Sequence, residues 1–125
     1  MSSSAGPTRA LTLCADLFFT LGIQRTAEGL GLTVDRAEDL DDLVEKARAP
    51  GPLLVLMELD QWKPGAVKRL RDAHGEKLSI LAFGSHVDRE TREAAEREGC
   101  DAVMPRSAFA KDVAGHLRKW TGAEG

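Results

Sequence analysis

The chain has 125 residues, 42% hydrophobic and 30% charged, which is ordinary for one globular domain with a core of its own. Its 17 basic and 20 acidic residues give a formal net charge of −3, and lysine and arginine form no block. Nucleic acid and anionic membranes are therefore not expected as direct partners. The longest apolar runs are too short to span a membrane, and residues 1–8 lack the features of a signal peptide, so we expect a cytoplasmic protein.

The first half of the chain predicts two strand–helix pairs after a flexible lead-in at residues 1–8. Apolar residues alternate before Asp16 and recur at helical spacing after it, and glycines then supply an end signal. A second short apolar run precedes an amphipathic segment that Pro50-Gly51-Pro52 stops. The predicted elements are a strand at Arg9–Cys14, a helix at Leu17–Leu30, a strand at Leu32–Val34 and a helix at Glu38–Ala49.

The middle of the chain contains the most informative segment, the unbroken apolar run Leu53–Met57, which Glu58, Leu59 and Asp60 follow. Such a run is typical of a strand buried on both faces, at the centre of a parallel sheet. The acid that follows should emerge at the carboxyl end of the strand, where open α/β sheets bind their ligands. We therefore expect chemistry, or its remnant, at the tip of this strand.

The second half predicts three more helices and two more strands. Asp88 is a plausible N-cap and Gly99 a stop signal for one helix, and Ser107 should cap the last. The predicted elements are a loop at Asp60–Gly65, a helix at Ala66–Ala73, a strand at Leu78–Phe83, a helix at Asp88–Glu98, a strand at Ala102–Met104 and a helix from Ser107 to about Trp120.

This alternation of strands and helices predicts the class and the topology. Five such units indicate an α/β protein with right-handed crossovers, and their size fits a flavodoxin-like, doubly wound parallel sheet of order 2-1-3-4-5 with helices on both faces. Residues 9–120 then form a single domain, and residues 121–125 form a C-terminal tail. At its carboxyl edge such a sheet would bring together Asp16, Glu58, Gly84, Ser85 and Arg106.

These residues and their spacing resemble the receiver domain of two-component response regulators, from about Arg9 to Trp120. Receivers carry a pair of acids after the first strand, which hold Mg²⁺; the pair is Ala15-Asp16 here. Their acceptor aspartate lies in a segment like LVLLDL, where this chain has VLMEL with Glu58 at the acceptor position.

The resemblance continues in the second half of the chain with further departures. Receivers have Thr or Ser and then Ala after the fourth strand, where this chain has Gly84-Ser85. They have Gly-Ala-Asp before the fifth strand and Lys-Pro after it; the corresponding residues are Gly99-Cys100-Asp101 and Arg106-Ser107. Since several catalytic positions differ at once, the resemblance implies a degenerate pseudo-receiver.

The residues that differ from the receiver pattern are those that phosphoryl transfer requires. Phosphoryl transfer needs a nucleophilic carboxylate, a metal ion and donors around the transferred oxygens. Glu58 is one methylene longer than aspartate, so it reaches roughly 1.5 Å too far, whereas about 1 Å already matters for in-line geometry. We expect no cofactor, with Asp16 and Glu58 as weak candidate ligands for Mg²⁺.

Three acids at the predicted sheet edge each have two possible roles. Glu58 either mimics a phosphorylated aspartate or is an acid paired with Arg106 in a bidentate contact, and we predict that contact. Asp16 is either a vestigial metal ligand or the N-cap of the first helix. Asp60 is a fallback acceptor because Pro64 follows it at the receiver-like spacing of four, but that choice would put Glu58 inside the buried strand.

The remaining expectations concern cysteines and aromatic residues. Cys14 and Cys100 lack metal-site or redox spacing and should be buried, reduced thiols. In Phe18-Phe19 only one ring can point fully inward, so the other should lie exposed at the rim of the site. Trp62 either anchors a partner or packs over the third helix.

The function expected from the resemblance is that of a stand-alone, non-enzymatic signalling module. It would bind a protein partner, or a second copy of itself, independently of phosphorylation. Receivers pair through the fourth helix, fifth strand and fifth helix, so candidate contact charges are Arg89, Glu93, Arg97, Asp101, Lys111 and Arg118. The alternative is an active receiver that accepts a phosphoryl group from a histidine kinase with Mg²⁺. A flavodoxin-like ligand site is a weaker alternative because the loops carry no GxGxxG.

Overall fold

The computed structural model describes residues 9–75, 78–85 and 87–122. The predicted lead-in at residues 1–8 and the last three residues of the predicted C-terminal tail, 123–125, lie outside the described residues.

A five-stranded parallel sheet of order β2-β1-β3-β4-β5 forms the middle of the molecule, as predicted. The central strand β3 is buried along its whole length, which accounts for its unbroken apolar sequence. The strands are β1 (Arg9–Leu13), β2 (Thr33–Arg36), β3 (Leu53–Glu58), β4 (Leu78–Gly84) and β5 (Ala102–Pro105).

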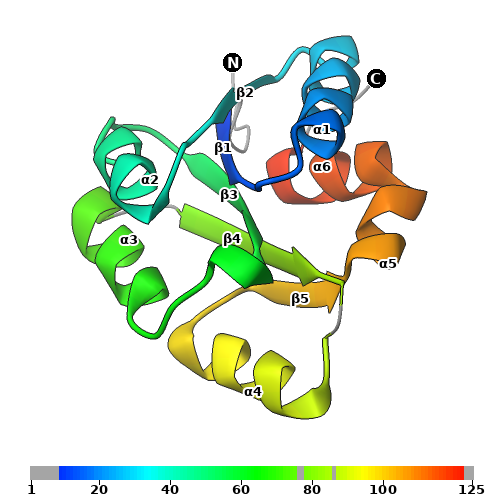
Figure 1. Cartoon of the computed structure of the whole chain (residues 1–125). Helices are drawn as coiled ribbons and strands as arrows, with labels where there is room; N and C mark the ends of the chain where they lie inside the picture. The colour runs from blue at the N-terminus through cyan, green and yellow to red at the C-terminus, as the bar shows by residue number, and fades with distance from the viewer. Residues whose placement is uncertain (1–8, 76–77, 86, 123–125) are drawn as a thin grey trace.

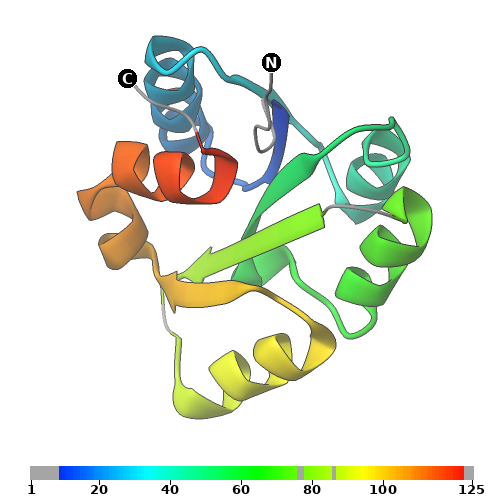
Figure 2. The same cartoon turned by 180° about the vertical axis from the view of Figure 1, so that it is seen from behind.

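Helices cover both faces of the sheet, and each face has its own hydrophobic cluster (Figures 1 and 2). Residues of α2, α3 and α4 pack on one face, and residues of α1, α5 and α6 pack on the other. The helices are α1 (Leu17–Gly29), α2 (Leu40–Lys46), α3 (Ala66–His74), α4 (Arg89–Glu98), α5 (Arg106–Lys111) and α6 (Val113–Thr121), and a short 3₁₀ helix, η1 (Leu59–Gln61), follows β3.

Side-chain caps explain where several helices begin. Asp16 accepts a hydrogen bond from the Phe19 backbone N–H, and Asp88 accepts one from Thr91. Gly99 ends α4 in the left-handed region at φ +115°, where a glycine is favoured. The predicted N-cap at Asp88 and the predicted stop at Gly99 are confirmed.

The prediction of one long last helix capped by Ser107 is wrong. The segment forms two helices, α5 and α6, and the chain leaves helical geometry at Asp112, where φ is −153°. The Asp112 carboxylate accepts a hydrogen bond from the Gly115 N–H and so starts a new helix. The residue before α5 is Pro105, which makes no side-chain cap.

The broken helix nevertheless keeps the predicted apolar face. Phe109 and Leu117 are buried, and Val113 and Trp120 pack against the same cluster while partly exposed. Within the described residues, no helix combines the length and the hydrophobicity needed to cross a membrane.

Candidate functional site

The carboxyl ends of the strands bring the predicted site residues to one edge of the sheet. Asp16 caps α1 just after β1, Glu58 is the last residue of β3, and Gly84 is the last residue of β4. Arg106 begins α5 directly after β5. Strand register aligns these ends, because Glu58 lies beside Phe83 and Gly84 lies beside Pro105.

Arg106 is the centre of this edge and binds Asp16. Its Nη2 donates a hydrogen bond to Asp16 Oδ2, which makes an ion pair between two half-buried side chains. The guanidinium also lies over the Phe19 ring, 4.1 Å from its centroid, in cation–π geometry. The bond to Asp16 raises the pKa of Arg106, so the charge on this group is permanent.

Asp16 uses both carboxylate oxygens within the protein. Oδ1 accepts the Phe19 N–H at 3.0 Å, and Oδ2 accepts from Arg106. The Arg106 hydrogen bond, followed by the Phe19 N–H, lowers the pKa of Asp16. The interpretation of Asp16 as an N-cap is therefore confirmed.

Glu58 is nearly buried, with 5% of its surface exposed, and it binds the backbone of the neighbouring strand connection. The Ala15 N–H donates to Glu58 Oε1 at 3.1 Å. Its other oxygen lies 4.0 Å from Arg106 Nη1, too far for a hydrogen bond.

The predicted direct contact between Glu58 and Arg106 is therefore present only as an ion pair at 4.0 Å, and the two parallel hydrogen bonds expected of it do not form. The chain after β1, which carries Ala15 and Asp16, lies next to β3, whereas β4 separates β3 from β5. Glu58 binds the Ala15 N–H of this neighbouring segment, and the long Arg106 side chain reaches past the tip of β3 to Asp16. The two ions still lie close enough to attract each other, so Arg106 neutralises both acids unequally.

An aromatic cluster supports Arg106 from beneath. Phe19 packs edge-on against Phe83 and Phe109, with ring centroids 5.4 and 6.0 Å apart. Phe83 and Phe109 stack with centroids 4.9 Å apart. Phe83 and Phe109 were not among the predicted site residues, although the position of Phe83 at the end of its strand, just before Gly84, was a usable signal. As predicted for the Phe18-Phe19 pair, Phe19 turns toward the core and Phe18 is exposed.

No protein-family model matches the chain, and no curated protein matches it. Solved structures match over almost its whole length. A two-component response regulator from Clostridium difficile is 14% identical, with a TM-score of 0.76 over 89% of this chain and 93% of that chain. A response regulator from Thermotoga maritima is 13% identical, with a TM-score of 0.77 over 91% and 96%.

A third match comes from Saccharomyces cerevisiae, in the co-crystal structure of the histidine phosphotransfer protein Ypd1 with the receiver domain of Ssk1. It is 13% identical to this chain, with a TM-score of 0.77 over 94% of this chain and 91% of that chain. At these identities the similarity concerns the fold. The chain has the receiver fold.

Gly84, the last residue of β4, stands at the position where receivers carry Thr or Ser, and it is buried. A Cβ atom there would lie 3.2 Å from the Leu59 Cβ, so Leu59 would have to move to admit a side chain. The next residue, Ser85, is exposed. This chain therefore has no side-chain hydroxyl at position 84, and Leu59 lies where a side chain on that residue would extend.

The structure removes the sequence-based objection to Asp60 as an acceptor. That objection was that Glu58 would then lie inside the buried strand, and Glu58 does lie inside β3. Asp60 itself lies in η1 and is exposed to solvent. It thus remains the accessible acid nearest in sequence to the tip of β3.

The residues at this edge do not fit the Mg²⁺ site that the receiver resemblance implies. Mg²⁺ needs oxygen ligands in near-octahedral geometry. Both oxygens of Asp16 are already bound, Glu58 holds a backbone N–H, and the Arg106 cation lies between the acids. Among the described residues, no group of three or more His, Cys, Asp and Glu side chains is arranged to hold a metal ion.

The predicted contact charges form two groups. Arg89 and Glu93 make an exposed ion pair on α4, 3.2 Å apart. Asp101 instead binds inward, since it accepts from the Ile80 N–H and pairs with Arg71. Asp101 therefore has a structural role that its place in the predicted contact face did not indicate. Arg97, Lys111 and Arg118 are exposed.

The two cysteines and Trp62 lie in the hydrophobic clusters on the faces of the sheet. Cys14 and Cys100 are free and buried, as predicted, and burial raises the pKa of Cys100 to about 12. Trp62 is partly buried against the α2–α3–α4 face, and its Nε1 donates to Glu98 at 3.2 Å. Glu98 also accepts from the Gly65 N–H at 2.7 Å, so it ties α4 to the segment before α3.

Proposed function

We propose that this chain is a pseudo-receiver that acts by binding protein without accepting a phosphoryl group. The observation that carries the proposal is the pairing of Asp16 with Arg106 beside the buried Glu58. A working receiver needs these positions free for a metal ion and a transferred phosphoryl group. Here the protein's own groups satisfy them.

The same arrangement explains how the conformation could be independent of phosphorylation. Glu58 carries one negative charge where a phosphorylated aspartate would bring about −1.5 to −2. Arg106 is held by Asp16 and the Phe19 ring at the start of α5. In the proposed function, α5 and the β5–α5 junction therefore have the same conformation at all times. Partner binding then does not require phosphorylation by a kinase.

Two structural neighbours agree with protein binding as an output. One neighbour is the receiver domain of Ssk1 in complex with Ypd1, and another is the beryllofluoride-activated receiver domain dimer of NtrC4. We extend protein contact, but not phosphotransfer, from these proteins to this chain. The exposed charges of α4, α5 and α6 are one candidate contact surface.

A second candidate function is that of an active receiver, favoured by the exposed position of Asp60. Incubation with acetyl phosphate and Mg²⁺, followed by intact-protein mass spectrometry, separates the two functions. We expect no mass gain of a phosphoryl group. A gain in the wild type that Asp60→Asn or Glu58→Gln abolishes would overturn the proposal and identify the acceptor.

The same preparation is examined by amide NMR with beryllofluoride, which imitates a bound phosphoryl group. We expect no shifts around Glu58 or Asp60, because the acid at the strand tip already holds the Ala15 N–H. A known active receiver treated in parallel provides the positive control for both reagents.

A further inference from the structure

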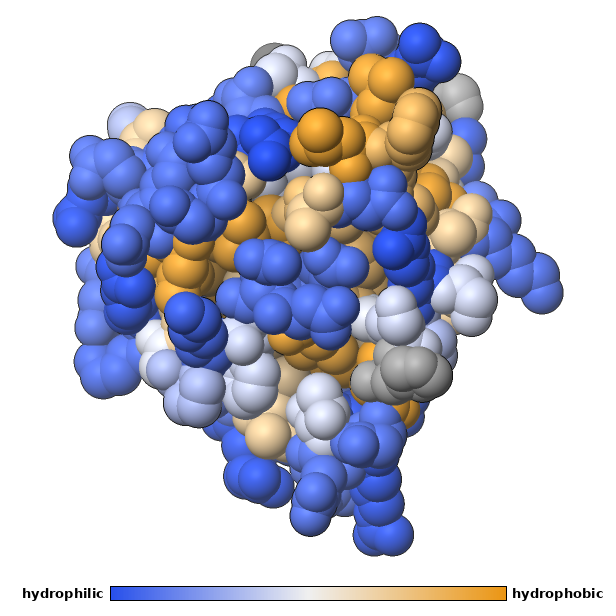
Figure 3. All heavy atoms as spheres, in the orientation of Figure 1, coloured by the Kyte–Doolittle hydropathy of each residue, from blue (hydrophilic) through white to orange (hydrophobic). Residues whose placement is uncertain are grey.

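An exposed apolar patch lies on the first two turns of α1, beside the Arg106 site. Leu17 is 59% exposed, Phe18 is 88% exposed and Leu21 is 43% exposed. Within the part of the chain that the structure describes, these are the only large hydrophobic side chains classed as exposed. Figure 3 shows apolar atoms gathered at the upper right, where Figure 1 places α1. Exposed apolar side chains that adjoin one another in this way are a candidate contact surface.

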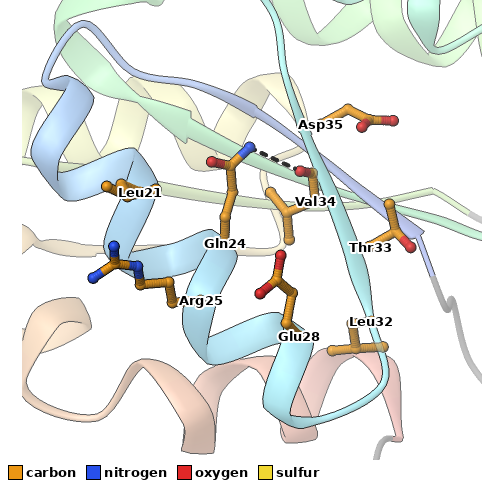
Figure 4. A pocket seen from close by; sticks show the side chains of 8 residues that line it. All are labelled: Leu21, Gln24, Arg25, Glu28, Leu32, Thr33, Val34 and Asp35. Atoms are coloured by element: carbon orange, nitrogen blue, oxygen red, sulfur yellow. Dashed lines mark hydrogen bonds between the residues drawn. The ribbon is translucent and has the colours of Figure 1, made fainter.

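A hollow of about 410 Å³ adjoins this patch toward the C-terminal end of the same helix. Leu21, Gln24 and Arg25 border it from α1, and Leu32 and Val34 border it from the β2 side, as Figure 4 shows. It is large enough to admit an aromatic side chain. Leu21 belongs both to the apolar patch and to the hollow, so the two features are continuous.

We infer that the α1 face, defined as Leu17, Phe18 and Leu21 with the adjoining hollow, pairs with the α1 face of a second copy of this chain. The inference deepens the proposed function, because it names the partner of a protein-binding module. In a two-fold pairing each copy offers the same surface, so a protrusion on one copy must fit a recess on the other. This face contains both, with Phe18 as the protrusion and the hollow as the recess.

Helix spacing determines which residues meet. In an antiparallel pair with the two-fold axis at Leu21, Phe18 lies three residues before the axis and faces Gln24 of the other copy, three residues after it. Leu17 likewise faces Arg25. Phe18 thereby enters the hollow, where its ring can stack against Arg25 and lie on Leu32 and Val34. The acids Glu28 and Asp35 also border the hollow.

The charge pattern of α1 favours this antiparallel arrangement. The N-terminal half of the face carries no charge, whereas the C-terminal half carries Arg25 and Glu28. A parallel pair would place Arg25 against Arg25 and Glu28 against Glu28, and like charges repel. The antiparallel pair sets each charged half against an uncharged half and avoids both repulsions.

The same hollow is less suited to an added β-strand. Strand β2 is at the edge of the sheet, and an edge strand normally offers free backbone groups. Here the Gln24 Nε2 donates to the Val34 carbonyl at 3.0 Å, as Figure 4 shows. An extended peptide would have to displace that bond, whereas a side chain entering the hollow would not.

Sedimentation velocity of the full 125-residue chain over a range of concentrations tests the inference. Because three apolar side chains and one hollow per copy make a small interface, below about 1,200 Å² in total, we expect a reversible dimer. Phe18→Glu should weaken dimerisation at least about tenfold. Since Phe18 is 88% exposed, the variant should unfold at the wild-type urea concentration when both are compared at dilutions where the wild type is monomeric. Ala49→Glu adds the same charge at an exposed position after α2, on the other face, and should dimerise like the wild type.

Cysteine cross-linking tests the antiparallel arrangement. A mixture of Leu17→Cys and Arg25→Cys chains should form mixed disulfide dimers upon oxidation, and the buried Cys14 and Cys100 should not compete. Predominant Leu17→Cys homodimers would indicate a parallel pair and overturn the arrangement.

A chain that stays monomeric at all concentrations, or a dimer that Phe18→Glu leaves intact, would overturn the inference. Neither result touches the proposed absence of phosphorylation, which the mass measurement decides separately. Conversely, a phosphorylated chain that still dimerises through α1 would overturn the proposed function and leave this inference in place.

Discussion

Arg71 and Arg106 each pair with an aspartate at an end of the sheet, Arg71 at the amino ends of β4 and β5 and Arg106 at the carboxyl edge. Arg71 binds mainly backbone: it donates to the Leu78 carbonyl at 3.0 Å and to the Gly99 carbonyl at 2.7 Å, and it also reaches Asp101. Arg106 binds a side-chain carboxylate and stacks on an aromatic ring.

The difference separates a structural brace from a site. Backbone carbonyls occupy fixed positions in the fold, so the contacts of Arg71 hold strand ends together whatever the neighbouring side chains are. The contacts of Arg106 depend on Asp16 and Phe19, which a single substitution can change. Contacts of this second kind therefore vary with the side chains around them, whereas most contacts of Arg71 do not.

The largest expected effect is on the brace. Arg71→Met removes hydrogen bonds to two carbonyls and to Asp101, and we expect the free energy of unfolding to fall by about 2–3 kcal/mol. Arg69→Met is the matched control on the same helix, because the Arg69–Asp41 pair is exposed and should contribute roughly 0–1 kcal/mol. Urea unfolding followed by circular dichroism measures both. Equal losses would mean that Arg71 is not a brace.

The sequence predicted the fold because its strongest signals are local and repeated. The run Leu53–Met57 identifies the buried strand, and Asp16, Asp88 and Gly99 mark helix ends through contacts within a few residues. Asp112 carried a signal of the same kind, but the apolar spacing across it is continuous and favoured one helix. Such spacing reports a shared buried face, which α5 and α6 do share.

The partner of Arg106 could not be predicted in the same way. The sequence brought Asp16, Glu58 and Arg106 to one edge, but the choice of partner for Arg106 depends on side-chain positions that spacing along the chain does not specify. It depends also on competition: the Ala15 N–H binds Glu58, and the Phe19 ring positions the guanidinium. Neither competitor is a charged residue, so a search for opposite charges does not find them.

A smaller effect is expected from loosening the site, and pH reveals it. The pKa of Asp16 is lowered from 3.8, chiefly by Arg106, so the ion pair stabilises the folded protein fully above that value. The contribution disappears as the pH falls through the lowered pKa. Arg106→Met should therefore raise the pKa of Asp16 in carboxyl NMR titrations. The stability difference between wild type and variant should shrink below about pH 4.

A thermodynamic cycle assigns the pairing in the same experiment. Single and double variants of Asp16→Asn with Arg106→Met should show a larger coupling than those of Glu58→Gln with Arg106→Met, because only Asp16 shares a hydrogen bond with Arg106. A larger coupling for the Glu58 pair would restore the contact predicted from sequence and contradict the structure.

The smallest expected effect is that of Mg²⁺ on the wild type. To bind Asp16 and Glu58, the ion would have to displace the Arg106 cation from Asp16 and the Ala15 N–H from Glu58. We therefore expect calorimetry to show binding no tighter than millimolar.

Arg106→Met removes the competing cation but keeps both carboxylates, so it should bind Mg²⁺ roughly tenfold more tightly. Arg71→Met, which removes an arginine at the opposite edge, should bind as weakly as the wild type. Sub-millimolar binding by the wild type would show that Arg106 leaves the acids available. Equal weak binding by the wild type and Arg106→Met would show that the Arg106 cation is not what keeps Mg²⁺ from the two acids.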